Sequence, residues 1–346
     1  MEKLENQKIL TYADRTQKNE RINLLDSIPL KGPLLVHLEP TNICNFKCKF
    51  CPESLDDYKD KAGGLFNLSL DNFTKILNEL KKVPKLKSLN FFMMGEPLAN
   101  KNIIKFVKMA SSSNISDTYM ISTNGALLTK EKYSDLCESG LNYLRISIFG
   151  SNEIAHFNAT QSKIKLSRVK ENILNFKKFK EDNSYSYPRI LVKMIKSEVE
   201  EENEEFLREF DGTGDEILLE PLTNWNDPGD TEFYKVDKNN IYRSDHYSKR
   251  KRICPYPFYS LVIHSDLKVS VCCVDWEKKT VIGDLSKENL LNIWNGKSLR
   301  NMQLKHIQGR IKDIEGCKDC SYLHTTKDNI DSLDEKTFKS RLNGNL

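Results

Sequence analysis

Apolar runs of strand length alternate with segments of helical periodicity over the first 220 residues, and this alternation limits the possible folds more than any other feature. The strand-like runs cover residues 34–39, 86–94, 118–122, 143–148, 190–195 and 216–220. The intervening segments repeat apolar side chains every three or four positions, and the expected helices cover residues 69–80, 103–110, 130–137, 166–176 and 201–210. Strands that alternate with helices usually lie parallel and are joined by right-handed crossovers. The sequence therefore predicts an α/β sheet or barrel with its active site at the carboxyl ends of the strands.

The chain divides into two parts joined by a polar stretch. At 346 residues it exceeds one average domain. The expected order is a polar leader, a large α/β domain, a linker, a small cysteine-rich domain and a tail, at residues 1–32, 33–225, 226–253, 254–326 and 327–346. The small domain has few apolar side chains but five of the nine cysteines, so a bound metal would explain how it folds.

Charge and hydropathy indicate a cytoplasmic protein without affinity for nucleic acid or membranes. The 53 basic and 49 acidic side chains leave a net charge of +4, spread along the chain. We interpret the basic run at 249–252 as part of the linker. No apolar stretch approaches the roughly 18 to 20 residues of a membrane span, and the N-terminus lacks a signal-peptide core. Nine cysteines in a reducing compartment favour ligation of metal or clusters over disulfides.

The first cysteine group follows the first predicted strand and contains three thiols within eight residues, Cys44, Cys48 and Cys51. A [4Fe–4S] cluster held by three thiolates keeps one iron open for a small-molecule chelate, whereas structural zinc takes four protein ligands. Phe50 precedes the last cysteine and would shield the cluster from water. A zinc site that takes a distant fourth ligand is the alternative.

This CxxxCxxC spacing with an aromatic residue before the third cysteine resembles the signature of the radical S-adenosylmethionine (SAM) superfamily. The resemblance implies a partial (β/α)6 TIM-like barrel and a [4Fe–4S] cluster whose open iron binds the amino and carboxylate groups of SAM. Reductive cleavage of SAM then gives a 5′-deoxyadenosyl radical. The cofactor does the difficult chemistry and the protein orients it.

Two further segments at strand ends resemble motifs of this superfamily. The segment that ends the second strand resembles the GGEP motif, which meets the methionine ammonium, and supplies Met94, Gly95 and Glu96. Met94 stands where the first glycine is usual. The segment that ends the third strand resembles the TNG segment, which lies near the ribose and carboxylate of SAM, and supplies Ser122, Thr123 and Asn124.

The fourth strand ends at a candidate SAM-contacting residue. Ser147 fits the serine position of relatives, although a serine in a β-bulge is the alternative. Phe149 stands where many relatives carry an acidic residue. This difference argues against a mechanism taken from the peptide-modifying relatives that use the acid.

The second cysteine group lies in the small domain. Four thiolates from three places can ligate either zinc or a closed [4Fe–4S] cluster, and they are Cys254, Cys272, Cys317 and Cys320. Cys273 is an alternative to its neighbour. Cys137, by contrast, falls on the apolar face of an expected helix and is interpreted as buried packing.

The order of residues in this region resembles the SPASM or twitch extension that follows many radical SAM barrels. In that pattern an aspartate and then a glycine precede the second cysteine. Asp266 matches the aspartate and favours Cys272, although neither cysteine recovers the glycine. Because full SPASM domains carry more cysteines and a second auxiliary cluster, we expect one auxiliary [4Fe–4S] cluster here.

The leading hypothesis from the resemblance is oxidation of a secondary alcohol on a sugar or aminocyclitol, with a flavodoxin- or ferredoxin-type electron donor. Asp275 is the candidate catalytic base, and His264 is a second candidate. For each of them, a surface or turn residue without a catalytic role is the alternative. Two alternatives remain open. One is radical modification of a peptide or protein, and the other is a non-catalytic interaction protein stapled by zinc.

Overall fold

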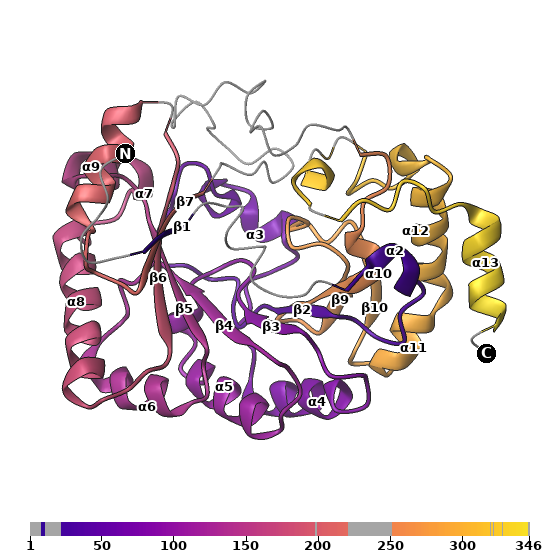
Figure 1. Cartoon of the computed structure of the whole chain (residues 1–346), viewed down its shortest axis with the longest axis horizontal. Coiled ribbons are helices and arrows are strands. Elements are labelled where there is room, and N and C mark those ends of the chain that lie inside the picture. Colours follow the sequence, from indigo (N-terminus) through magenta and orange to yellow (C-terminus); the bar gives the residue numbers. More distant parts are fainter. Residues whose placement is uncertain are drawn as a thin grey trace.

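The computed structural model describes residues 8–10, 22–197, 199–220, 251–318, 320, 322–326 and 328–344. Residues 226–250 of the expected linker, and the domain boundary at 225, lie outside the described residues. The described strands form one sheet in the order β1-β7-β6-β5-β4-β3-β2-β8-β9-β10 (Figure 1). From β1 to β8 every neighbouring pair is parallel, which confirms the predicted α/β class.

Six strands of the sheet correspond to the six predicted from apolar runs. They are β2 (Leu35–Leu38), β3 (Ser88–Phe91), β4 (Tyr119–Thr123), β5 (Tyr143–Ile148), β6 (Arg189–Ile195) and β7 (Glu216–Glu220). The second is shorter than predicted, because Leu86 makes only an isolated bridge and the chain turns after Phe92. A short strand in the expected leader, β1 (Lys8–Leu10), pairs in parallel with β7 and was not predicted.

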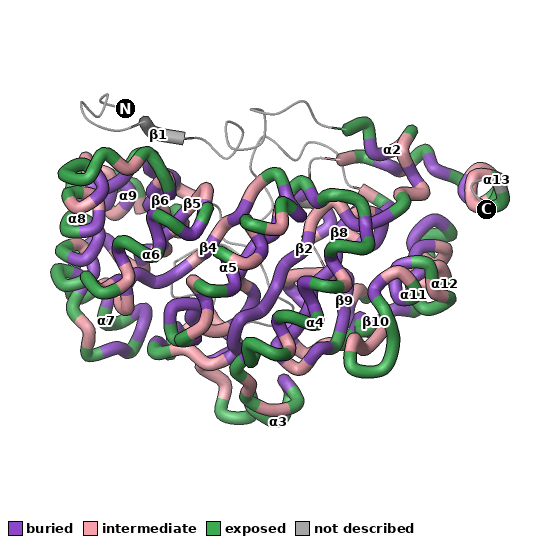
Figure 2. Tube along the Cα trace, turned by 90° about the horizontal axis from the view of Figure 1, so that it is seen from below, coloured by how far each residue is buried: buried purple, intermediate pink, exposed green. Residues whose placement is uncertain are grey.

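Helices cover the outer side of this sheet, as Figures 1 and 2 show. They are α4 (Leu70–Leu80), α5 (Ile103–Ser112), α6 (Tyr133–Glu138), α7 (Glu153–Thr160), α8 (Leu166–Asp182) and α9 (Glu200–Glu209). Ser69 caps α4, because its hydroxyl accepts a hydrogen bond from the backbone N–H of Asn72 at 3.1 Å. Cys137 lies in the core between helices and sheet, as its position on the helix predicts.

The C-terminal part continues the same sheet. Its elements are α10 (Tyr256–Tyr259), β8 (Ser260–Ile263), β9 (Lys268–Ser270), β10 (Val281–Asp284), α11 (Leu290–Asn295), α12 (Lys297–Ile307) and α13 (Glu335–Gly344). Strand β8 pairs in parallel with β2, and His37 lies opposite Val262. A second small core joins the N-terminal helix α2 (Leu24–Ser27) to this part, and Phe338 of α13 is buried in it. The two cysteine-rich regions therefore share one sheet.

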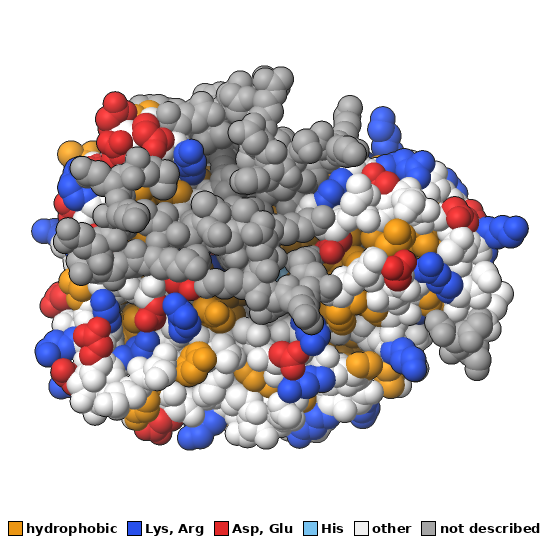
Figure 3. Space-filling model, viewed as in Figure 1, with side chains coloured by type: hydrophobic (Ala, Val, Ile, Leu, Met, Phe, Trp, Pro, Cys, Tyr) orange, Lys and Arg blue, Asp and Glu red, His pale blue; other side chains and the backbone are white. Residues whose placement is uncertain are grey.

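None of the described helices is long and apolar enough to cross a membrane. One further helix, α3 (Tyr58–Lys61), follows the first cysteine group. On the described part of the face in Figure 3, basic and acidic side chains are interspersed and do not separate into patches of one sign.

We expect Phe73→Ala to destabilise the barrel. The Phe73 ring is fully buried and stacks on Phe106 with ring centroids 4.4 Å apart, so truncation leaves a cavity between α4 and α5. Such truncations cost about 3 to 5 kcal/mol. Urea unfolding followed by circular dichroism should show a lower midpoint. Phe157→Ala is the matched control, since that ring is 52% exposed, and an equal loss in both variants would contradict the packing argument.

Candidate cluster and cofactor sites

The first cysteine loop connects β2 to α3 and is fastened to helix α7. The backbone N–H of Lys47 donates to the carbonyl of Thr160 at 2.9 Å, and the N–H of Lys49 donates to Ala159 at 3.0 Å. These bonds hold the loop at the carboxyl end of the helix. The loop carries the three thiols at Cys44, Cys48 and Cys51.

The surroundings of the three thiols suit a metal cluster. The backbone N–H of Phe46 donates to Cys44 Sγ at 3.5 Å, and Asn124 Nδ2 lies 3.9 Å from the same sulfur. Burial raises the pKa of all three thiols, to about 12 for Cys51, and the nearby Glu53 carboxylate raises each of them further. Iron offsets this cost by holding the thiolate form, so the residues fit a cluster with three protein ligands.

Aromatic rings enclose one side of the cysteine loop. Phe50 lies against Phe149 with ring centroids 5.4 Å apart, and Phe46 meets Phe149 edge to face at 6.5 Å. Phe149, which stands where relatives carry an acid, therefore packs beside the loop. Phe46 also meets the ring of His156 from α7 at 5.7 Å. This contact adds to the backbone bonds that fasten the loop to the helix.

The turn after β3 passes close to the first cysteine loop. Gly95 has φ +72°, and a Cβ built on it would lie 2.4 Å from the carbonyl oxygen of Thr41 and 2.8 Å from the nitrogen of Ile43. Only glycine fits this backbone approach. Met94, which precedes it, is buried. In this chain Met94 replaces the usual first glycine of the motif. The second glycine, Gly95, is kept because it lies where the turn after β3 touches the cysteine loop.

Glu96 joins the turn after β3 to the turn after β4. One carboxylate oxygen accepts a hydrogen bond from Thr123 Oγ1 at 2.6 Å, and the other accepts from the backbone N–H of Asn124 at 2.7 Å. The Asn124 side chain in turn donates to Asn45 Oδ1 at 2.8 Å. The structure thus brings the GGEP-like segment, the TNG-like segment and the cysteine loop together.

The remaining predicted SAM-contacting residues face the inside of the barrel. Ser122 accepts a hydrogen bond from Arg145 Nε at 3.0 Å. Ser147 is half-buried and lies opposite Lys193 of β6 in the register. Lys193 forms an ion pair with Glu220 at the end of β7. None of these three charged side chains was predicted as a site residue from the sequence. Charges at alternate positions of otherwise apolar strands could have indicated a polar inner face.

Glu53 is a further residue that the sequence analysis missed. It is 3% exposed, and its carboxylate accepts a hydrogen bond from the backbone N–H of Gly95 at 2.7 Å. Burial raises its pKa to about 7, against the opposing influence of the nearby Lys47 ammonium. Its position two residues after Cys51 gives the turn around Gly95 a second attachment to the cysteine loop.

Four of the five C-terminal cysteines line one cavity, and they are Cys254, Cys272, Cys317 and Cys320. In the part of the chain that the structure describes, no three His, Cys, Asp or Glu side chains converge closely enough to hold a single metal ion. The four thiols instead surround the cavity. Its lining fits a larger group with four protein ligands, such as the expected auxiliary cluster.

Cys273 lies next to that cavity but is not among the residues that line it. It packs with Met93, Met94 and Trp276 at the seam between the barrel and the C-terminal part. Its sulfur lies 3.7 Å from the Tyr322 hydroxyl. This arrangement supports the preference for the neighbouring cysteine as the auxiliary ligand, which stays a prediction.

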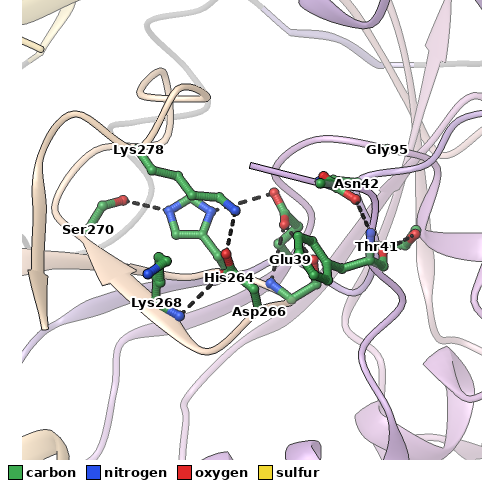
Figure 4. Close-up of polar contacts among 12 residues, drawn as sticks. Glu39, Thr41, Asn42, Gly95, His264, Asp266, Lys268, Ser270 and Lys278 are labelled. Atoms are coloured by element: carbon green, nitrogen blue, oxygen red, sulfur yellow. Dashed lines mark hydrogen bonds and ion pairs between the residues drawn. The ribbon is translucent and has the colours of Figure 1, made fainter. Parts of the chain in front are cut away.

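Both candidate bases, Asp275 and His264, make contacts that stabilise the structure around them. Asp275 accepts hydrogen bonds from the backbone N–H groups of Lys279 and Thr280 and from the Thr280 hydroxyl, so its carboxylate organises its own loop. His264 is buried, with Nε2 2.8 Å from Ser270 Oγ and Nδ1 3.6 Å from Glu39 (Figure 4). A catalytic role for Asp275 stays a prediction, and these contacts do not favour it.

Glu39 lies just after β2 and connects the carboxyl end of this strand to His264 and Ser265, which follow β8. Its burial opposes the charged form, but the nearby His264 imidazole and the hydrogen bonds from Ser265 hold its pKa below the usual value. The Ser265 hydroxyl donates to Glu39 Oε1 at 2.7 Å, and the Glu39 N–H donates to the carbonyl of Ile263 at 2.9 Å. The two cysteine-rich regions are therefore joined by polar contacts as well as by the sheet.

His37 lies inside the barrel on β2 and was not singled out in the sequence. It is 5% exposed, and neither ring nitrogen has a hydrogen-bond partner among the described residues. The ring meets Phe92 edge to face at 5.3 Å. The pKa of Cys273 is lowered by its hydrogen bond with Cys272 and then by His37, which places the imidazole beside the seam.

The sheet, the three-thiol loop and the four-thiol cavity define a protein with a parallel α/β core and two separate cysteine sites. The chain belongs to the radical SAM superfamily, whose profile matches residues 38–210. The profile of the SPASM iron–sulfur cluster-binding domain matches residues 254–321. The protein is therefore a radical SAM enzyme with SAM and two iron–sulfur clusters as cofactors. The domain match also decides between zinc and a cluster at the second cysteine group, in favour of the cluster.

Three relatives illustrate the range of similar proteins. A tungsten-containing aldehyde ferredoxin oxidoreductase cofactor-modifying protein of Pyrococcus furiosus is 27% identical over 322 residues, covering 83% of this chain and 86% of its own. A PqqA peptide cyclase of Bradyrhizobium diazoefficiens is 34% identical over 121 residues, covering 35% of this chain and 30% of its own. An S-adenosyl-L-methionine-dependent 2-deoxy-scyllo-inosamine dehydrogenase of Niallia circulans is 29% identical over 107 residues, covering 31% of this chain and 41% of its own.

Solved structures share the fold over most of the chain. BtrN in complex with AdoMet and 2-DOIA has a TM-score of 0.55 at 18% identity and covers 83% of this chain and 92% of its own. Native anSMEcpe with bound AdoMet has a TM-score of 0.59 at 14% identity, with coverages of 90% and 95%. Streptococcus suis SuiB bound to the precursor peptide SuiA has a TM-score of 0.58 at 15% identity, with coverages of 80% and 68%.

We expect Gly95→Ala to weaken SAM binding at least about tenfold, because the added methyl group forces the turn away from the cysteine loop. Isothermal titration of SAM into anaerobically reconstituted protein measures this loss. Gly63→Ala is the matched control: it has the same positive sign of φ, at +74°, but its Cβ would meet nothing within 4 Å. Equal affinities for both variants would show that the close approach is unimportant for SAM.

Proposed function

We propose that this enzyme oxidises a secondary alcohol of a sugar or aminocyclitol, by removal of a hydrogen atom, a proton and an electron. Bound SAM and the first cluster supply a 5′-deoxyadenosyl radical for the hydrogen abstraction. The chain's own residues bind SAM, orient the alcohol, accept its proton and hold an electron acceptor. The cysteines at the second site would hold that acceptor.

The observation that carries the proposal is the polar interior of the barrel. Arg145, Lys193 and Glu220 extend inward from neighbouring strands, among half-buried serines. Charged groups of both signs inside a barrel suit a small substrate that carries hydroxyl and amino groups, because each buried polar group of the substrate then finds a partner.

His37 is our candidate for the proton acceptor. Loss of the hydroxyl proton from an alcohol needs a base within hydrogen-bond reach, and imidazole is the usual one near neutral pH. The buried ring nitrogens of His37 make no hydrogen bond of normal geometry with a described residue. The imidazole is close enough to the Cys273 thiol to lower its pKa, so the side chain lies beside the seam between the two cysteine-rich regions. A bound alcohol would supply that partner.

The names of similar proteins also support a small-molecule substrate. The relative from Niallia circulans is named a 2-deoxy-scyllo-inosamine dehydrogenase. The Pyrococcus furiosus relative, which aligns over most of both chains, is named a cofactor-modifying protein. We further propose that the enzyme works in the cytoplasm and receives electrons from a flavodoxin- or ferredoxin-type donor.

Peptide modification is the second candidate. It is favoured by the alignment to a PqqA peptide cyclase and by the fold shared with SuiB, whose structure contains a precursor peptide. The peptide cyclase alignment spans 30% of that relative's length.

Anaerobic assays with SAM and reductant distinguish the two substrate classes. The proposal predicts a product lighter than its substrate by two hydrogen atoms in a pool of sugars and aminocyclitols, together with 5′-deoxyadenosine. Mass spectrometry of parallel sugar and peptide pools measures both. A product found only among peptides would overturn the carbohydrate proposal and support the second candidate.

We expect His37→Gln to uncouple the reaction. Glutamine keeps a hydrogen-bonding side chain but cannot take a proton, so ketone formation should fall roughly 100-fold. Release of 5′-deoxyadenosine should remain within a few fold, because SAM binds elsewhere. The ratio of ketone to 5′-deoxyadenosine is the readout. Asn90→Ala, the register neighbour on β3, is the control and should leave the ratio unchanged. An unchanged ratio in the His37 variant would exclude it as the base.

A further inference from the structure

One buried histidine lines the four-cysteine cavity. His306 lies on α12, near its carboxyl end, and is completely buried. Its side chain borders the cavity together with the thiols of the second site. Neither of its ring nitrogens has a hydrogen-bond partner among the described residues. Buried polar groups are nearly always hydrogen-bonded, and an unsatisfied one costs about 1 to 3 kcal/mol, so an imidazole in this position indicates a partner inside the cavity.

The other residues around the cavity do not meet this need. Much of the remaining lining is apolar, from Val271, Ile311 and Leu323. The Tyr256 and Tyr322 hydroxyls lie 2.8 Å apart and bond to each other. Among the described side chains that line the cavity, the strong acceptors that remain are the thiolates of the four cysteines, together with the sulfide of the cluster that they would hold.

Helix α12 is fixed in position relative to the cavity. One turn before the histidine, Gln303 donates a hydrogen bond to the carbonyl of Pro257 at 2.8 Å and accepts one from Arg300 at 2.9 Å. Pro257 itself lines the cavity. The histidine is therefore held on a rigid element at a set distance from the thiols, which is the condition for a directed hydrogen bond.

We propose that His306 donates an N–H···S hydrogen bond to the auxiliary cluster and raises its reduction potential. A neutral imidazole carries one N–H donor, and four thiolates already complete the ligand set, so the histidine acts as a donor to sulfur. Reduction adds negative charge to the cluster, and a hydrogen bond to sulfur stabilises the more negative form more strongly. The inference rests on the cluster and does not depend on the identity of the substrate.

The test measures the potential of the auxiliary cluster alone. In full-length protein with Cys44, Cys48 and Cys51 changed to alanine, only the auxiliary cluster remains, and its midpoint potential is read by EPR-monitored titration. His306→Phe keeps a planar ring but removes the N–H. We expect it to disfavour reduction about tenfold, a negative shift of about 59 mV for one electron, with iron content unchanged.

Two comparisons make this result specific. His306→Gln retains an N–H donor and should recover at least half of the shift. Ile307→Val changes the next residue, which packs into the small core with α13 rather than around the cavity, and should leave the potential unchanged. If His306→Phe does not accumulate, His306→Leu replaces it in the comparison with His306→Gln, because leucine also lacks an N–H donor.

Two outcomes would overturn the proposal. An unchanged potential in a fully loaded His306→Phe protein would show that the side chain does not bond to the cluster. Loss of iron in that variant would show that the histidine is a ligand and not a donor. Because potential and iron are both measured without substrate, neither outcome depends on the alcohol oxidation proposed above.

Discussion

Strand β2 is hydrogen-bonded on both sides, and the placement of both cysteine-rich regions depends on it. It pairs in parallel with β3 of the barrel and with β8 of the C-terminal part. The first cysteine loop begins where β2 ends, and the chain from β8 leads through β9 to Cys272. A slip of one residue in this register would turn His37 from the inside of the barrel to the helix-covered side. The β2–β8 pairing therefore sets the relation between the two sites.

Buried carboxylates connect loops that regular secondary structure leaves apart. Glu39 joins the ends of β2 and β8, Glu53 accepts the backbone N–H of the turn after β3, and Glu96 joins that turn to the one after β4. Irregular loops leave backbone N–H groups without partners in regular secondary structure, and the carboxyl oxygens of these side chains accept them. The loops that would surround SAM are thereby fixed before it binds, which reduces the cost of ordering them.

The barrel and the two cysteine groups were predictable because their signals are local. Apolar periodicity gave six strands close to their observed bounds, and cysteine spacing gave the loop and the cavity. The pairing of β1 with β7 was not predictable, because a three-residue strand carries no periodicity. Asp275 resembled a base in the sequence, but only tertiary contacts show that its carboxylate organises a loop. His37 and His306 were missed for a similar reason: a buried nitrogen without a partner is visible only once its neighbours are known.

The central claim is that two separate cysteine sets each hold a cluster and that only the first serves SAM. Iron and bound SAM counted in the same anaerobic samples test it most directly. The account predicts about eight irons per chain in the unaltered protein and about four after either set is changed to alanine. SAM binding should be lost when Cys44, Cys48 and Cys51 are changed to alanine. It should persist when the four C-terminal cysteines are changed instead. Unaltered protein that contains no iron and ignores SAM, or SAM binding that survives loss of the first three thiols, would contradict the account.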